Sequence, residues 1–210
     1  MIRPTGLAVL LSGRGSNFRA IHAAVQMGRI PVPVLAVVSN RADAEGLERA
    51  SALGVPVFAL DDRDFPSRKA HEQELIRVVQ EAGADLVILA GYMRRLSPYF
   101  VTQFPSRIVN IHPSLLPSFP GVKAQEQALK HGVKISGCTV HLVDEQLDAG
   151  PIVLQRVVDV RDDDSVESLS SRILAQEHEA FVEALARLSG GYRVEGRQVV
   201  FAMPESSSLG

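Results

Sequence analysis

The chain has 210 residues, 46% of them hydrophobic, so it can build one sizeable α/β domain or two small, closely packed ones. Its formal charge of −2 and its lack of a long Lys or Arg cluster argue against a nucleic-acid partner. Cys138 is the only cysteine, which excludes an internal disulfide and a cysteine-based zinc site, and we expect no metal. No apolar run approaches the ~20 residues that cross a bilayer, and the N-terminal run is too short for a signal peptide. We therefore expect a cytoplasmic protein with no membrane partner.

The first half of the sequence alternates apolar runs with amphipathic segments. Runs made almost wholly of Val, Ile, Leu and Ala predict buried strands over 6–12, 32–39, 55–60 and 85–91. Helical spacing and terminal glycines predict helices over 16–28, 43–54 and 67–83. Buried strands that alternate with helices indicate a doubly wound, mostly parallel α/β sheet, which is a Rossmann-like arrangement. Ligands of such sheets bind beyond the carboxyl ends of the strands.

The second half has a different order of elements. Strands are predicted over 107–111, 136–143 and 151–160, and helices over 122–132 and 165–191. The last two of these strands are separated only by 144–150, so we expect them to be antiparallel neighbours. The sequence ends with a predicted hairpin over 192–201 and a short tail.

A glycine loop, "SGRGSN", lies where the first strand meets the first helix. Its glycines allow a sharp turn, and the following helix N-terminus offers free N–H groups to an anion. Phe18 stands where a dinucleotide loop needs a small residue, and Asn40 follows the second strand in place of a ribose-binding acid. We therefore favour a monophosphate, with a purely structural turn as the alternative.

Asn110 and His112 lie two residues apart at the end of a predicted interior strand. Side chains with this spacing point to the same side of a strand. A single core histidine would usually be satisfied by the backbone, but the pairing with Asn at a strand end favours a functional site. Pro113, Pro117 and Pro120 follow and would keep the next loop rigid around a substrate.

Asp148 lies in "LDAGP", a turn closed by Gly150 and Pro151. The spacing alone favours an ordinary turn aspartate. If it converged with the Asn–His pair, the set would suit acyl transfer to an amine, because Asn and protonated His can donate to a developing oxyanion. A nearby carboxylate would raise the pKa of the histidine and help to move the amine proton. No Ser or Cys nucleophile accompanies these residues, which favours direct transfer without an acyl-enzyme.

Motifs spread along the chain carry a family resemblance. "LLSGRGSN", "AGYMRRLS", "NIHPSLLPSFPG", "GCTVHLV" and "LDAGPIVLQ" follow one another at suitable spacing between about Leu7 and Arg187. Together they closely resemble the phosphoribosylglycinamide formyltransferases, which are folate-dependent enzymes of purine synthesis. "NIHPSLLP" with "LDAGP" is typical of the wider formyl-folate transferase group. Within that group, "SGRGSN" and the short chain length favour the phosphoribosylglycinamide formyltransferases.

The resemblance implies transfer of a formyl group from 10-formyltetrahydrofolate, the co-substrate, to the amino group of glycinamide ribonucleotide. It implies that His112 is the catalytic acid, Asn110 its oxyanion partner and Asp148 the carboxylate that tunes the histidine. The implied ribonucleotide-binding residues are Gly15, Ser16, Asn17 and Glu177. The implied folate-binding residues are Arg68, Met93, Arg94, Arg95, Leu96 and Asn110.

The resemblance also indicates which domains and partners to expect. We expect a phosphate-binding half over 1–105, a catalytic and folate-binding half of the same compact domain over 106–203, and a flexible tail over 204–210. The expected partners are the two small-molecule substrates, and the expected assembly is a monomer or a homodimer. This chain has "VKAQEQAL" where some family members carry histidines, which puts the role of 122–127 in doubt. Arg95 stands where some members have an apolar residue.

Three other functions stay open at this point. A formyltetrahydrofolate hydrolase shares the Asn–His–Asp set but usually carries an extra N-terminal domain, for which we expect no room here. A methionyl-tRNA formyltransferase would need a further C-terminal domain and a basic surface. A nucleotide-binding module without turnover would leave the Asn110–His112 pair unused.

Five remaining residues receive short predictions. Cys138 is expected in the core, because it lies in an apolar strand. His141 shares a strand face with Thr139, which fits either a site residue or a packed one. His22, His71 and His131 are expected on helix surfaces.

Overall fold

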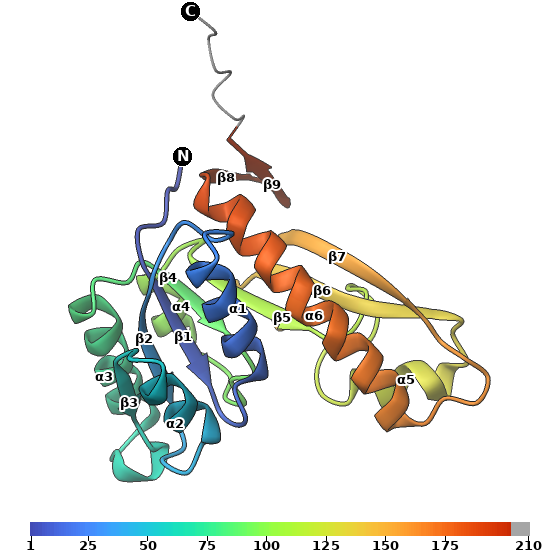
Figure 1. Cartoon of the computed structure of the whole chain (residues 1–210), viewed down its shortest axis with the longest axis horizontal. Coiled ribbons are helices and arrows are strands. Elements are labelled where there is room, and N and C mark those ends of the chain that lie inside the picture. Colours follow the sequence, from blue (N-terminus) through green and yellow to red (C-terminus); the bar gives the residue numbers. More distant parts are fainter. Residues whose placement is uncertain (203–210) are drawn as a thin grey trace, which may run out of the picture.

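A computed structural model describes residues 1–202, which form a nine-stranded sheet with helices on both faces (Figure 1). The strand order is β3-β2-β1-β4-β5-β6-β7-β9-β8. The sheet is parallel in the first half and mostly antiparallel in the second, so the expected fold class is confirmed. The expected tail over 204–210 lies outside the described residues.

The first half is doubly wound. Its strands are β1 (Leu7–Leu11), β2 (Val34–Ser39), β3 (Val57–Ala59) and β4 (Leu86–Leu89), and β5 (Ile108–His112) continues the parallel order. The connecting helices are α1 (Ser16–Gln26), α2 (Glu45–Ala52) and α3 (Arg68–Glu81). Because β1 is flanked by β2 on one side and β4 on the other, the strand order reverses beside β1. The carboxyl ends of these strands are where such sheets bind ligands.

The second half adds antiparallel strands to the same sheet. Its elements are α5 (Ala124–His131), β6 (Ile135–Leu142), β7 (Ile152–Asp159), α6 (Val166–Ser189), β8 (Tyr192–Glu195) and β9 (Gln198–Phe201). The expected antiparallel pairing of β6 with β7 is confirmed. The expected terminal hairpin also forms, and it joins the sheet edge through a parallel pairing of β9 with β7.

Two apolar cores cover the two faces of the sheet. On β1, Leu7, Val9 and Leu11 face the core formed with α1, α2 and α6, whereas Ala8 and Leu10 face the core beneath α3 and α4. All five are fully buried. This burial on both faces explains why β1 is a continuous apolar run instead of an alternating one. Helix α6 lies across β6 and β7 and beside α1, as Figure 1 shows.

Several local features differ from the sequence-based expectation. The short helix α4 (Pro98–Gln103) and the 3-10 turn η1 (Asp62–Asp64) were not predicted. The expected surface position of His71 is wrong, because this residue is 1% exposed. Its Nε2 donates to the Leu60 carbonyl at 3.0 Å, and its ring packs edge-on against Phe65. The loop before α3 therefore folds back over the histidine, a tertiary contact that helical spacing does not reveal.

Candidate active site

The glycine loop between β1 and α1 has the geometry of an anion site. Gly15 precedes α1 with a φ of 71°, which is left-handed backbone that favours glycine. A Cβ there would lie only 2.9 Å from Cα of Gly46, so the loop and the start of α2 are in close contact. No side chain caps α1 and no acidic residue lies in its first turn. The first N–H groups of α1 are thus left for a ligand.

Two of the expected ribonucleotide-binding residues meet beside this loop. Asn17 of α1 donates through Nδ2 to Oε2 of Glu177 on α6 at 3.1 Å, and both residues are largely buried. Burial raises the pKa of the Glu177 carboxyl, although the Asn17 hydrogen bond opposes that shift. Oδ1 of Asn17 is buried without a hydrogen-bond partner among the described residues. An unsatisfied buried acceptor is costly, and a ligand hydroxyl or amine could satisfy it.

His112 and Asp148 lie together, although 36 positions of sequence separate them in the chain of 210 residues. Nδ1 of His112 is 3.5 Å from Oδ2 of Asp148, and both side chains are more than nine-tenths buried. Nε2 of His112 donates to the Phe119 carbonyl at 2.8 Å. The same Oδ2 of Asp148 accepts from the backbone N–H of Gly121 at 2.8 Å. The turn aspartate is therefore held between the imidazole and the proline-rich loop.

Asn110 and His141 form the second half of this cluster. Neighbouring strands place them opposite each other in the β5–β6 register, and Nδ2 of Asn110 lies 3.2 Å from Nε2 of His141. Nδ1 of His141 lies 3.0 Å from the Leu142 carbonyl, to which it can only donate. Nε2 then accepts from Asn110, which requires a neutral imidazole. Burial lowers the pKa of His141, in agreement with this state.

The open question about His141 is thereby answered, because it lies in the cluster. Its Nε2 is 3.8 Å from Oδ1 of Asp148, whereas His112 approaches the other carboxylate oxygen, Oδ2. From the sequence, His141 fitted a site residue and a packed residue equally. The available signal was the antiparallel pairing of its strand, which brings His141 directly opposite Asn110. Cys138 is buried in the core as expected, and burial raises the pKa of its thiol to about 12.

The loop after His112 is fastened to the sheet through Thr139. The Thr139 hydroxyl donates to the Ser114 carbonyl at 2.7 Å and accepts from the Leu116 N–H at 3.0 Å. Gln155 of β7 donates to the Leu116 carbonyl at 2.9 Å. The prolines are thus supported by side chains from β6 and β7, and the expected stiffness of this loop has a structural basis.

The expected folate-binding segment, Met93–Leu96, follows β4. Met93 is 79% exposed, whereas Leu96 is buried in the core beneath α4. Arg94 pairs with Asp62 of η1. Arg68 does not extend freely into solvent, because its Nε donates to Oε1 of Glu72 at 3.1 Å and its Nη2 donates to the Arg95 carbonyl.

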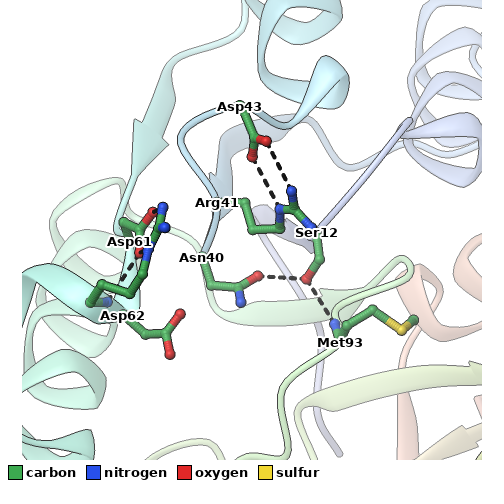
Figure 2. Close-up of a pocket in the computed structure, with 8 residues that line it drawn as sticks. Ser12, Asn40, Arg41, Asp43, Asp61, Asp62 and Met93 are labelled. Carbon is green, nitrogen blue, oxygen red and sulfur yellow. Dashed lines mark hydrogen bonds and ion pairs between the residues drawn. The ribbon is translucent and has the colours of Figure 1, made fainter.

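A cavity of about 500 Å³ opens between the carboxyl ends of β1, β2 and β3 (Figure 2). Its carboxylates are paired with arginines, Asp43 with Arg41 and Asp61 with Arg63. Figure 2 also shows the Ser12 hydroxyl between Asn40 and Met93. Its lining is Ser12, Asn40, Arg41, Asp43, Asp61, Asp62, Arg63 and Met93. The cavity adjoins the Met93–Leu96 segment but contains no residue of the His112 cluster.

The geometry as a whole offers an anion-binding helix end, an Asn–His–Asp–His cluster and an exposed loop segment at one end of the sheet. Within residues 1–202, no group of three or more His, Cys, Asp or Glu side chains is arranged to hold a metal ion. Nor does that part of the chain contain a helix long and apolar enough to cross a membrane. Hydrogen-bond donation and proton transfer are the chemistry that the cluster can supply.

Comparison with known proteins assigns the class. The model of the family described as "Formyl transferase" matches residues 6–185, nearly the full length of the described chain. The chain belongs to this formyl transferase family.

More specific relatives are phosphoribosylglycinamide formyltransferases. The enzyme of that name from Escherichia coli is 43% identical over 185 residues, which cover 88% of this chain and 87% of the relative. The structure of glycinamide ribonucleotide transformylase 1 from Symbiobacterium toebii is 50% identical with a TM-score of 0.91, covering 94% of this chain and 93% of that one. The resemblance predicted from the sequence motifs is confirmed.

A longer relative contains a similar segment. The trifunctional purine biosynthetic protein adenosine-3 of Drosophila melanogaster is 46% identical over 187 residues. The match covers 88% of this chain but only 14% of that protein. The likeness therefore concerns one segment of the trifunctional protein and none of its other parts.

Proposed function

We propose that the chain transfers the formyl group of 10-formyltetrahydrofolate to the amino group of glycinamide ribonucleotide, in purine biosynthesis. The attack is direct, with no acyl-enzyme. The observation that carries the proposal is the contact of His112 and Asp148 beside Asn110, at the carboxyl end of β5. The family and its relatives supply the class of reaction.

The glycine loop holds the ribonucleotide in this proposal. The first N–H groups of α1, after Gly15, bind the phosphate, because they carry the positive end of the helix dipole. Ser16 adds a hydroxyl at the first position of the helix. Asn17 and Glu177 accept from the sugar or amine end of the ligand, and the unsatisfied Oδ1 of Asn17 supports this assignment.

The Asn–His–Asp–His cluster acts on the carbonyl that the amine attacks. Asn110 uses one N–H on His141 and keeps its second N–H for the oxygen that gains negative charge. His112 exchanges its bond to the Phe119 carbonyl for one to that oxygen. In this proposal Asp148 stabilises positive charge on the imidazole and accepts the proton released by the amine. His112 gives a proton to the nitrogen that leaves the carbonyl carbon as their bond breaks, and it recovers a proton from Asp148.

The folate lies along Met93–Leu96. When bound, 10-formyltetrahydrofolate supplies the formyl group, and this segment provides backbone groups and the apolar, exposed Met93 side chain. Arg68 uses Nε and Nη2 within the protein but retains Nη1 for a carboxylate of the ligand. The described residues therefore fit a folate with an acidic tail.

The remaining assignments follow from this function. We place the protein in the cytoplasm, with two small molecules as its partners. The 1–105 half contributes the phosphate loop and the folate segment up to Leu96, and the 106–203 half contributes the cluster around His112. Folate contacts thus come from both halves.

An assay with each substrate alone and with both together tests the proposal. Formyl transfer requires both, so tetrahydrofolate should form only when 10-formyltetrahydrofolate and glycinamide ribonucleotide are present together. Release of formate without the ribonucleotide would instead identify a hydrolase. Binding of the ribonucleotide with no turnover under any condition would identify a binding module and refute the proposed function.

A further inference from the structure

Glu72 is a buried carboxylate that lies outside the catalytic cluster. It belongs to α3 and is 2% exposed. A glutamate is almost never buried this completely unless charged or hydrogen-bonding partners surround it. Its partners therefore indicate what it does.

The partners of Glu72 connect α3 to the end of the folate segment. Oε1 accepts from the backbone N–H of Ser97 at 2.8 Å and from Nε of Arg68 at 3.1 Å. Oε2 accepts from the Ser97 hydroxyl. Ser97 directly follows Leu96 and caps α4, where its Oγ accepts from the Phe100 N–H at 3.3 Å. One carboxylate thus holds the residue that directly follows the segment.

The other end of the segment has its own attachment. The N–H of Met93 donates to the Ser12 hydroxyl at 2.8 Å, and this hydroxyl donates to Oδ1 of Asn40 at 2.5 Å. Ser12 and Glu72 therefore fix the segment Met93–Leu96 at its two ends. Between these points the side chains of Met93 and Arg95 remain exposed.

Glu72 also orients Arg68. Its carboxylate takes Nε of the guanidinium, and Nη2 donates to the Arg95 carbonyl. Because the guanidinium is planar and rigid, these two contacts determine the direction of its free N–H groups. Arg68 is 45% exposed, so the free groups are accessible to a ligand.

We propose that Glu72 is a positioning residue for the folate co-substrate: it holds Ser97 and Arg68 so that Met93–Leu96 is in place before the ligand binds. This inference rests on the proposed function, because that function assigns the segment to folate. Pre-organisation lowers the cost of binding, so the loss of Glu72 weakens folate binding specifically. The ribonucleotide, bound at α1 and α6, is unaffected.

The decisive variant is Glu72→Gln, which keeps the shape of the side chain but removes the charge. We expect the KM for 10-formyltetrahydrofolate to rise about tenfold, the effect of weakening hydrogen bonds to one charged group. The KM for glycinamide ribonucleotide should stay at the wild-type value. Glu74→Gln is the matched control, because Glu74 lies on the same helix and, among the described residues, pairs with Arg77 alone. It should leave both KM values unchanged.

A second variant keeps the test valid if Glu72→Gln folds poorly. Ser97→Ala removes the hydroxyl from Glu72 and should raise the same KM, with no change in the KM for the ribonucleotide. Ser165→Ala is its control, because it removes a serine N-cap from a different helix, α6. Equal changes in both KM values, or an unchanged folate KM in both variants, would overturn the inference.

Calorimetry separates failure of this inference from failure of the proposed function. Tetrahydrofolate is titrated into the wild type and each variant, so the dissociation constant is measured without turnover. A wild type that binds tetrahydrofolate but transfers no formyl group refutes the proposed function alone. A wild type that transfers formyl, with variants that bind tetrahydrofolate equally well, refutes the role of Glu72 alone. A wild type that neither binds tetrahydrofolate nor transfers a formyl group refutes both.

Discussion

Asn110 donates a side-chain N–H to Nε2 of His141, 3.2 Å away, and this bond exists only while the imidazole is neutral. Protonation of His141 would put a hydrogen on Nε2, so two N–H donors would face each other and the bond would be lost. The orientation of the proposed oxyanion donor thus depends on a buried histidine whose own pKa is lowered by burial.

This dependence predicts acid sensitivity. The pKa of His141 lies below 6.5 in the folded chain, so the unfolded chain takes up the proton first as the pH falls. The stability contributed by neutral His141 is therefore complete above pH 6.5 and is lost as the pH falls through its folded pKa. The free energy of unfolding should decrease by up to about 1.4 kcal/mol per pH unit through this group.

The measurement compares urea unfolding of the wild type and His141→Gln between pH 7.5 and 5. Gln offers an acceptor to Asn110 but does not titrate, so the stability advantage of the wild type should shrink in acid. His131→Gln, on an exposed helix surface, serves as the control. A constant difference between the wild type and His141→Gln would contradict the prediction.

Removal of the imidazole at position 112 should abolish most turnover. We expect His112→Ala to lose at least ~10²-fold in kcat while it stays folded, which is the usual contribution of a positioned acid. Steady-state kinetics and circular dichroism check the two statements. His131→Ala is the matched histidine control, and near-wild-type turnover of His112→Ala would remove the proposed role.

At Asp148, the effect of losing the negative charge can be separated from the effect of losing the hydrogen bond to the loop. Asp148→Asn retains an oxygen that can accept from the Gly121 N–H but removes the charge 3.5 Å from the imidazole. We expect kcat to fall at least about tenfold, which corresponds to about 1.4 kcal/mol of lost charge stabilisation. Asp163→Asn, in an exposed turn, controls for the loss of a carboxylate. If both variants kept the wild-type kcat, the carboxylate would have no part in proton transfer.

Gly15 and Gly28 allow the cost of a left-handed backbone to be separated from the cost of a steric contact. Gly15 and Gly28 both have a φ of 71°, but a Cβ at Gly15 would lie 2.9 Å from Cα of Gly46, whereas a Cβ at Gly28 would lie in open space. Both alanine variants lose roughly 1–2 kcal/mol from the left-handed backbone. Gly15→Ala should lose more and should also raise the KM for the ribonucleotide. Equal unfolding free energies for the two variants would show that the contact with Gly46 is unimportant.

The sequence predicted the strands and long helices well, because their burial leaves a clear pattern. The run over Leu7–Leu11 is apolar throughout and is buried on both faces. Helix α6 was predicted over 165–191, and the structure begins it at Val166 with Ser165 as its N-cap. The helix α4 was missed because its residues, Pro98–Gln103, carry neither amphipathic spacing nor enough length.

The site was predicted in part. The Asn110–His112 pair could be recognised because side chains two residues apart share one side of a strand. The approach of Asp148 depends on how β6 and β7 return the chain to β5. Its spacing in the sequence alone favoured an ordinary turn. His141 contacts Asn110, 31 positions away, and Glu72 contacts Ser97, 25 positions away. No local sequence pattern encodes such distant contacts. The binding and catalytic roles of all these residues stay predictions until the variants are measured.

The oxygen Oδ2 of Asp148 serves two neighbours at once, the amide of Gly121 and the ring of His112. Any outward swing of the proline-rich loop would strip that amide from the carboxylate and at the same time take the Phe119 carbonyl from the ring. One displacement of this loop would therefore weaken the hold on the carboxylate and on the imidazole together.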